Sequence, residues 1–306
     1  MPQSIVLSLT AQSLIPAHQI QGIALQQLFL HLIDIVDPEL GNVLRQDKEN
    51  KDYSLSAIQP LPSKRIGLAP PQENRLSETS TSRLQYLHSQ PLEVGTRCWW
   101  RISFLDDELF DHLIFLWRQF KGEEFCLGDG KVTITQITAN PLKTPWAGSC
   151  SYRDIYEQAD PQERNIHLQF VTPTAFKTVQ APALEDTAIY TPLPTPEAVF
   201  QPLRKRWNRY SGLAFTPNLI DALVPTHFNI QTQSAVAHHT AQQQTISGCV
   251  GQISFRITDG GDPLVTKRLN ALADFIHYCP IGSNTRLGMG IARRIANNII
   301  SLRQSS

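Results

Sequence analysis

Hydrophobic and polar residues recur with two different periods along the first half of the chain, and these periods predict its secondary structure. Alternating or β-branched and aromatic stretches, which are typical of strands, cover residues 5–12, 53–59, 97–105 and 132–139. Apolar residues at helical spacing cover residues 20–36, 37–46 and 106–120. Asp37 followed by Pro38 is a helix-start signal. The polar, proline-containing stretch 60–85 is expected to be an exposed, mobile connection.

The second half repeats the same order of elements. Strand patterns cover residues 166–176, 228–239, 246–257 and 289–297, and helical patterns cover residues 196–210 and 263–279. Each half therefore reads strand, helix, strand, strand, helix, strand, which is the order of a ferredoxin-like domain. We predict an α+β fold of two tandem ferredoxin-like βαββαβ domains, residues 1–150 and 151–306. Two such sheets side by side are expected to enclose a central cleft.

Composition is compatible with two cores and adds a charge asymmetry. The chain has 306 residues, of which 41% are hydrophobic and 18% charged, so wholesale disorder is excluded. The formal net charge is zero. From residue 201 onward, however, eleven Lys and Arg face four Asp and no Glu, a balance of +7. The first 200 residues carry the opposite balance, and the basic half is therefore expected to meet a polyanion.

Cysteine usage and hydropathy indicate a cytoplasmic protein. The five cysteines are scattered and form no CxxC pair, which is typical of reduced thiols. No run of 18 apolar residues exists, so we expect neither a membrane span nor contact with a membrane. The first residues lack a basic segment and fit a first strand better than a signal peptide.

Basic residues concentrate in the second half as candidate groups for contact with a polyanion such as RNA. Arginine suits phosphate because its planar fork binds two oxygens at once. The candidates are Arg204, Arg206, Arg209, Lys267, Arg268, Arg286 and Arg293. The bland interpretation of the run RKRWNRY is a solvated helix face.

The segment GSNTRLGMG, residues 282–290, forms a glycine-rich loop near the end of the chain. Such spacing lets backbone amide groups approach a bulky anion, most often a phosphate. The simpler alternative is a turn that joins a helix to a strand. The candidate phosphate-contacting residues are Gly282, Ser283, Arg286, Gly288 and Gly290.

No sequence feature indicates a metal or cofactor. His238 and His239 are adjacent, so in a strand they point to opposite faces, and no Cys or acidic cluster lies near them. The basic half lacks paired carboxylates, which argues against a two-metal nuclease. Walker GxxxxGKS/T and GxSxG sequences are absent. We expect no metal and no cofactor.

Four segments together resemble the CRISPR-associated repeat-processing endoribonucleases of the Cas6 family, a branch of the repeat-associated mysterious proteins (RAMPs). The segments are NIHLQFVTPTAF, PLPTPEAVFQPLRKRWNRYSG, ISGCVGQISFRI and ALADFIHYCPIGSNTRLGMGIARR. YSLSAI and CWWRISFLDDELFDHL in the first half also fit, so the resemblance spans nearly the whole chain. It implies metal-independent cleavage of CRISPR precursor RNA by 2′-hydroxyl attack, which leaves a 2′,3′-cyclic phosphate. It also implies that the glycine-rich loop braces the RNA backbone.

The resemblance places the catalytic centre after the short helix that follows DPxL, where the family commonly has a histidine. Here DPELGNVLR puts Arg45 at that position. Arginine is always protonated, so it can stabilise a transition state but makes a poor base. Arg45 with Lys48 or Lys51 is one candidate set. His31 is another candidate acid or base, against the simpler interpretation of a structural histidine on a mostly apolar helix face.

Three functions follow from these observations. The first is an endoribonuclease that cuts CRISPR repeat stem-loops and gives mature guide RNA, with other subunits of a CRISPR effector complex as further partners. The second is a catalytically weak or silent RNA-binding subunit of the same fold, which Arg45 favours. The third is a nucleotide-binding regulatory protein with tandem ferredoxin-like domains. A salt-dependent preference for hairpin RNA over mononucleotides distinguishes the third from the others.

Overall fold

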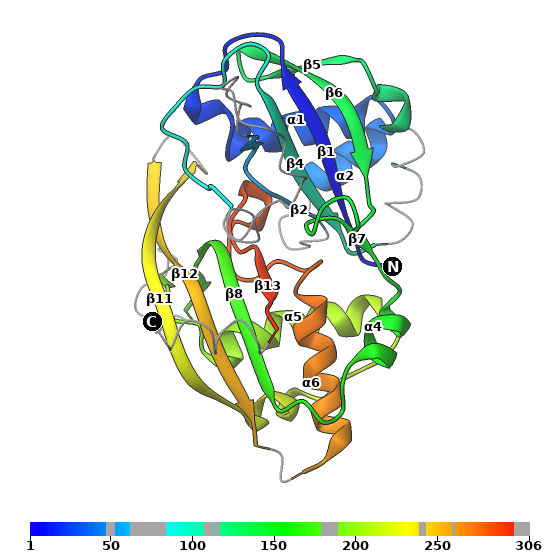
Figure 1. The fold of residues 1–306 in the computed structure, drawn as a ribbon, viewed down its shortest axis with the longest axis vertical. Coiled ribbons are helices and arrows are strands. Elements are labelled where there is room, and N and C mark those ends of the chain that lie inside the picture. The colour runs from blue at the N-terminus through cyan, green and yellow to red at the C-terminus, as the bar shows by residue number, and fades with distance from the viewer. Residues whose placement is uncertain are drawn as a thin grey trace, which may run out of the picture.

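The first half of the chain forms an antiparallel sheet covered on one face by helices (Figure 1). The computed structural model describes residues 1–46, 53–61, 84–106, 113, 117–178, 189–238, 243–258 and 261–296. Elements of the N-terminal half are β1 (Gln3–Ala11), η1 (Ala17–Gln19), α1 (Ile23–Asp34), α2 (Pro38–Gln46), β2 (Tyr53–Leu55), β3 (Gln59–Pro60), β4 (Arg97–Phe104), η2 (Arg118–Phe120), β5 (Glu124–Leu127), β6 (Gly130–Thr138) and β7 (Gly148–Ser149). The strand order is β2-β4-β1-β6-β5.

The second half builds a four-stranded antiparallel sheet with the same relative order. Its elements are α4 (Tyr152–Gln158), β8 (Asn165–Thr174), β9 (Phe176–Lys177), β10 (Tyr190–Thr191), α5 (Pro196–Tyr210), η3 (Pro217–Ala222), β11 (Leu223–His238), β12 (Gln243–Ile257), α6 (Pro263–Phe275), η4 (Thr285–Leu287) and β13 (Ala292–Arg294). The order β11-β12-β8-β13 matches β2-β4-β1-β6 of the first half. The predicted pair of tandem ferredoxin-like units is therefore confirmed.

Alternation along each first strand divides its side chains between two packed regions. Ile5, Leu7 and Leu9 of β1 join the core that α1 covers, whereas Val6 points to the other face. In the second half Ile166, Leu168 and Phe170 of β8 join the core beneath α5 and α6, and Val171 points away. Val6 and Val171 meet in one cluster, so the uncovered faces of the two sheets pack together there.

Arg101 on β4 forms a buried polar contact between the halves. Its Nε donates to Trp146 O at 2.9 Å, and its Nη2 donates to Ser4 Oγ at 2.7 Å and to His277 O. Arg101 is 3% exposed, and burial lowers its pKa to about 10. The cation therefore joins the N-terminal sheet to the end of α6.

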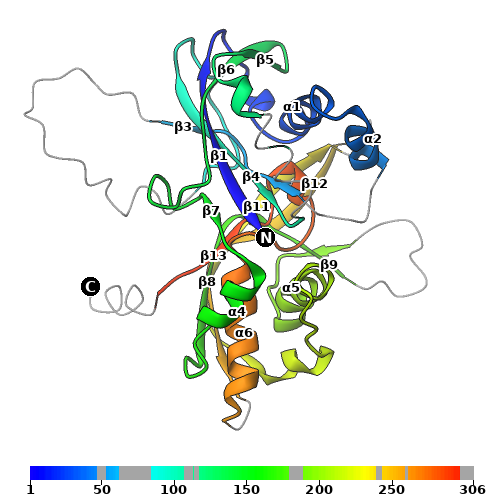
Figure 2. The same cartoon turned by 90° about the vertical axis from the view of Figure 1, so that its right-hand side faces the viewer.

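Several predicted elements need correction. The sequence-based prediction omitted β5 and α4, and the final strand begins at Ala292 rather than residue 289, because residues 289–291 still belong to the loop. The predicted helix over 106–120 and the predicted connection over 60–85 lie mostly outside the described residues. The domain boundary near residue 150 and the central cleft stay predictions. Figure 2 shows α1 and α2 on one side of the N-terminal sheet and α5 below them.

Candidate functional site

The corner between α1 and α2 brings Arg45 into contact with Asp34. Asp37 Oδ1 accepts the amide N–H of Leu40 at 2.9 Å, so α2 is capped as the sequence predicts. Arg45 lies in the last turn of α2. Its Nη1 donates to Asp34 Oδ1 at 2.9 Å, and its Nη2 donates to Asp34 Oδ2. Arg45 and Asp34 therefore form a bidentate ion pair between the two helices.

His31 lies one turn before Asp34 on the same helix. Residues three apart on a helix are neighbours, so His31 lies close enough to Asp34 to affect its pKa. The hydrogen bond from Arg45 is the main reason that the pKa of Asp34 lies below its usual range, and His31 lowers it further. His31 is exposed on α1, and whether it has a structural role or acts as an acid or base stays a prediction.

Tyr53 connects this corner to the glycine-rich loop. The ring of Tyr53 stacks on Phe29 with centroids 4.3 Å apart, and the guanidinium of Arg286 lies 4.7 Å from the same ring centroid. Gln26 Nε2 donates to the Tyr53 hydroxyl at 3.4 Å. The hydrogen bond to Asp34 is the main reason that the pKa of Arg45 is raised, and Tyr53 makes a smaller contribution in the same direction. Arg286 from the second half is thereby anchored beside the helices that carry Arg45.

The glycine-rich loop is largely packed inside the protein. Gly290 has a φ of +78°, and a Cβ there would collide with the carbonyl oxygen of Ile281. Gly282 and Ser283 are half-buried, the latter donating its amide to Ala175 O at 2.9 Å, and Gly288 is buried beside the backbone of Ala57. Close protein packing accounts for these glycines, and loop contact with RNA stays a prediction.

Two family models match the chain in succession. One, described as the CRISPR Cas6 N-terminal domain, matches residues 1–157. The other, described as the CRISPR-associated endoribonuclease Cas6, matches residues 168–292. The chain belongs to the Cas6 family.

Solved structures agree with the Cas6 fold. A Thermus thermophilus Cas6 in a product complex has a TM-score of 0.72 and 22% identity, with 96% of this chain and 100% of that chain covered. A Cas6 substrate mimic complex has a TM-score of 0.65 and 18% identity, with 96% and 99% covered. A RAMP protein that binds different RNA substrates has a TM-score of 0.54 and 12% identity, with 96% and 100% covered. No curated protein sequence matches the chain.

In this Cas6-family chain, two arginines of α5 make hydrogen bonds to other segments of the protein. Arg204 is 9% exposed and donates from Nη1 to Phe215 O at 2.9 Å, which fixes the turn after α5. Arg206 donates from Nη1 to Pro280 O at 2.6 Å and to Cys279 Sγ at 3.2 Å. Arg206 therefore braces the entrance to the glycine-rich loop. RNA binding by either residue stays a prediction.

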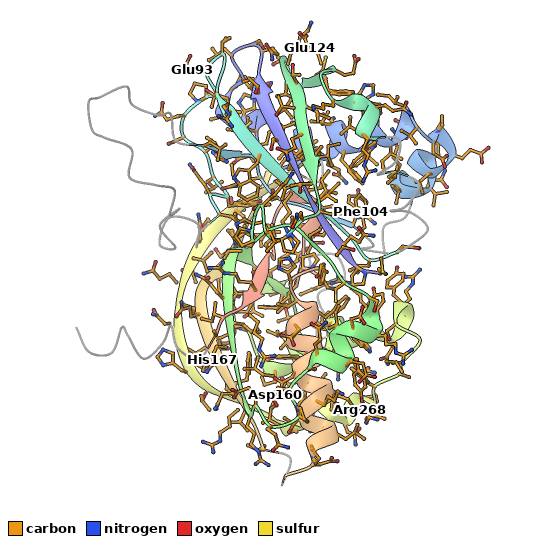
Figure 3. The ribbon with its side chains drawn as sticks, turned by 45° about the vertical axis from the view of Figure 1, so that its right-hand side comes forward. Glu93, Phe104, Glu124, Asp160, His167 and Arg268 are labelled. Atoms are coloured by element: carbon orange, nitrogen blue, oxygen red, sulfur yellow. The ribbon has the colours of Figure 1, made fainter. Side chains whose placement is uncertain are left out.

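The remaining predicted RNA-binding cations are distributed over several faces. Lys267 pairs with Glu157 at 3.4 Å, Arg268 lies over the Phe215 ring at 5.7 Å, and Arg209 lies over the Tyr210 ring at 5.3 Å. Figure 3 shows Arg268 at the end of the molecule opposite Glu124. Arg293 lies 5.3 Å from the Trp146 ring centroid, and its Nε donates to Gln169 Oε1 at 2.9 Å. The structure brings Arg286, rather than this whole set, to the Arg45 corner.

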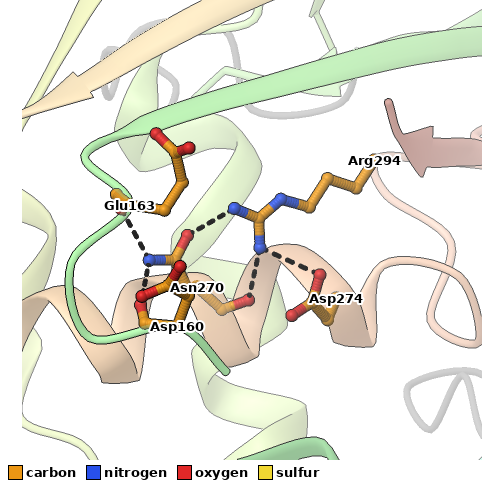
Figure 4. A network of polar contacts seen from close by, with 5 residues as sticks. All are labelled: Asp160, Glu163, Asn270, Asp274 and Arg294. Atoms are coloured by element: carbon orange, nitrogen blue, oxygen red, sulfur yellow. Dashed lines mark hydrogen bonds and ion pairs between the residues drawn. The ribbon is translucent and has the colours of Figure 1, made fainter. Parts of the chain in front are cut away.

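Arg294, the neighbour of Arg293, belongs to a structural network at α6 (Figure 4). It donates to Asp274 Oδ1 at 2.9 Å and to Asn270 Oδ1 at 2.6 Å. The amide nitrogen of Asn270 donates in turn to the carbonyl oxygens of Asp160 and Glu163, at 2.8 and 2.7 Å. This network ties β13 and the segment before β8 to one helix.

Lys48 and Lys51 lie outside the described residues. Among the residues that are described, no three His, Cys, Asp or Glu side chains gather as a metal site would require. No helix within the described ranges is long and apolar enough to cross a membrane. Sequence reasoning gave no role to Asp34 or Tyr53, because only the meeting of α1, α2 and β2 with the loop brings them to Arg45 and Arg286.

Proposed function

We propose that this Cas6-family chain cuts CRISPR precursor RNA within its repeats, without a metal, at the corner of Arg45, His31, Tyr53 and Arg286. The observation that carries the proposal is that Arg286 of the glycine-rich loop lies over Tyr53, beside the helices that hold Arg45 and His31. Two cations, one from each ferredoxin-like unit, thus lie near Tyr53 and close to the helix that carries His31. Charge stabilisation and proton transfer at a phosphodiester require groups of these kinds.

The reaction needs no atom from outside the RNA. The 2′-hydroxyl oxygen attacks the adjacent phosphorus while the bond from phosphorus to the 5′-oxygen breaks. The 2′-hydroxyl proton passes to a base, and the departing 5′-oxygen takes up a proton, so the products are a 2′,3′-cyclic phosphate and a 5′-hydroxyl. Arg45 stabilises the charge on the phosphate oxygens, and it does not act as the base because its guanidinium stays protonated.

His31 is the histidine at this corner, and an imidazole side chain is a common general acid or base in catalysis. Its exposure on α1 leaves it accessible to a substrate, and its charge interaction with Asp34 places it near Arg45. Lys48 and Lys51, in the segment after α2, remain candidates for additional phosphate contacts.

Structures of similar fold support RNA as the substrate class. Related Cas6 proteins have been captured in a product complex and in a substrate mimic complex. By extension we propose that a CRISPR repeat stem-loop is the partner of this chain, with effector-complex subunits as further partners. Recognition of the stem through its backbone and 2′-hydroxyls, with bases read where they are unpaired, follows from the general behaviour of RNA.

A second function, an RNA-binding subunit that does not cut, is favoured by one specific observation. The residue at the expected histidine position is an arginine whose two terminal nitrogens are engaged by Asp34. Membership of the endoribonuclease family leaves the third alternative, a nucleotide-binding regulatory protein, without support.

Incubation of the full chain with a labelled repeat hairpin in EDTA tests the proposal. The matched control is the same RNA with a 2′-deoxy nucleotide immediately before the scissile phosphate. We expect cleavage of the all-ribose RNA alone, with a cyclic phosphate on the upstream product. Cleavage of the 2′-deoxy RNA, or a strict need for divalent metal, would contradict the mechanism. Tight binding without cleavage would establish the second function.

A further inference from the structure

Asp34 is the immediate partner of Arg45, yet the proposed reaction gives it no role. It carries a negative charge next to the expected position of an RNA phosphate, where an anion is unfavourable unless it serves a purpose. The side chains of Arg45 and Asp34 are 42% and 31% exposed. Exposed ion pairs contribute little to folding stability, so stabilisation of the fold is a weak explanation for this one.

A glycine in α2 leaves space for the ion pair of Asp34 and Arg45. Gly41 of α2 lies directly under the carboxylate, and a Cβ at this position would collide with Asp34 Oδ1 and lie 3.1 Å from Arg45 Nη1. Glycine in the middle of a nine-residue helix is less favourable than alanine. The helix therefore accepts a less favourable residue where the carboxylate and the guanidinium meet.

The contact fixes the direction of the guanidinium and leaves part of it available. Arginine has five N–H groups, and Asp34 engages the edge formed by the two terminal nitrogens. The edge formed by Nε and its neighbouring N–H is not used by Asp34 and can receive two oxygens of a phosphate. A guanidinium held in this way needs no reorientation when charge develops on the phosphate.

We infer that Asp34 is a positioning residue that holds Arg45 in the orientation needed at the scissile phosphate, with Gly41 providing the space for this contact. The inference rests on the proposed function. The charged groups facing Asp34 in the described structure are Arg45 from α2 and His31 from α1. Asp34 acts through Arg45, so its effect must vanish when Arg45 is absent.

A double-mutant cycle on the full chain tests this dependence. The single-turnover cleavage rate and the dissociation constant of the repeat hairpin are measured for Asp34→Asn, Gly41→Ala, Arg45→Ala and the double variant Asp34→Asn/Arg45→Ala. We expect Asp34→Asn to slow cleavage about tenfold while the dissociation constant changes less than about twofold, since misplacement of a catalytic group affects the chemical step. The double variant should be as slow as Arg45→Ala alone.

Gly41→Ala is the variant that separates positioning from folding. Alanine favours the helix, so thermal stability should be kept or raised, while the displaced carboxylate should slow cleavage as Asp34→Asn does. Glu124→Gln, which removes another exposed ion pair of the N-terminal half, is the matched control and should leave the cleavage rate unchanged.

Two results would overturn the inference. If Asp34→Asn or Gly41→Ala binds more tightly or cuts faster, Asp34 competes with the phosphate for Arg45. If the effects of Asp34→Asn and Arg45→Ala multiply in the double variant, Asp34 acts independently of Arg45.

Failure of the proposed function is recognised separately, because the parent then binds the hairpin without cutting. In that case the dissociation constant of the repeat hairpin, instead of the cleavage rate, is compared across the same double-mutant cycle. We expect Asp34→Asn to weaken binding only when Arg45 is present, and equal weakening in both backgrounds would contradict the inference.

Discussion

Two arginines near the boundary between the ferredoxin-like units differ in almost every physical respect. Arg101 is 3% exposed and donates to uncharged oxygens of Trp146, Ser4 and His277. The side chain of Arg45 is 42% exposed and pairs with a carboxylate. Removal of Arg101 would leave buried acceptors without donors, whereas water can replace what Arg45 loses. The first arginine therefore maintains the arrangement of the halves, and the second is available for chemistry.

The largest expected effect on folding follows from Arg101→Met. Methionine fills similar space but leaves the carbonyl oxygens of Trp146 and His277 without this donor, and each unsatisfied acceptor costs about 1–3 kcal/mol. We expect the free energy of unfolding to fall by about 3 kcal/mol, measured by urea denaturation. A change below about 1 kcal/mol would mean that water or another donor replaces the guanidinium, and the contrast with Arg45 would disappear.

The next effect concerns the loop that carries Arg286 to Tyr53. Gly290→Ala introduces both a left-handed backbone penalty and a collision with Ile281, so we expect a loss of about 2–3 kcal/mol in unfolding free energy. Gly95→Ala is the matched control, because Gly95 also has a positive φ, +80°, with no atom within 4 Å of the added Cβ. The control should lose only about 1 kcal/mol. Equal losses would show that the loop is not tightly packed.

The stability of the fold should depend on pH through His277, whose backbone carbonyl accepts a hydrogen bond from Arg101. Burial, followed by the charge of Arg101, lowers the pKa of His277 from its ordinary 6.5 to about 3. Between these values the unfolded chain binds the proton and the folded chain does not, so stability falls as the pH decreases below about 6.5. One titrating group changes stability by at most about 1.4 kcal/mol per pH unit. Water reaches part of His277, so the slope should be smaller than this limit.

His277→Gln removes this titration and provides the measurement. The melting temperatures of the parent and of the variant are compared between pH 7.5 and pH 5.5. The parent should lose more stability than the variant over this interval. Parallel curves would mean that His277 is protonated in the folded protein, beside a buried arginine.

The smallest effect is expected for Asp34→Asn on stability. The pair with Arg45 is exposed, so the free energy of unfolding should change by less than about 1 kcal/mol, even though cleavage slows. Urea denaturation of Asp34→Asn and of Arg101→Met compares the stability contributions of the exposed Asp34–Arg45 pair and of the buried Arg101. A loss comparable with that of Arg101→Met would make the Asp34–Arg45 pair a structural contact.

Local signals made much of the fold predictable from the sequence. Thr195 and Pro196 define the start of α5, and the predicted helix 196–210 has the bounds that the structure shows. Asp37 likewise caps α2 as predicted. The start of β13 was misplaced because the positive φ of Gly290 is imposed by packing against Ile281, which no local pattern reveals.

The candidate site could be predicted only in part, for the same physical reason. The DPxL motif pointed to Arg45, and the glycine pattern pointed to Arg286. The contact of Asp34 with Arg45 depends on the angle between two helices, and that of Arg286 with Tyr53 depends on how two domains pack. The alternation of residues along β4 also gives no sign that the charged Arg101 is buried between the two ferredoxin-like units.

Single-turnover cleavage of the repeat hairpin by Arg45→Ala is the most direct test of the claim that the exposed arginine is the reactive one. Arg118→Ala, at another exposed arginine of the N-terminal half, is the control. We expect Arg45→Ala to cut at least about a hundredfold more slowly, while RNA affinity changes only a few-fold and the control cuts like the parent. If Arg45→Ala cuts as fast as the parent, the catalytic assignment of Arg45 is wrong.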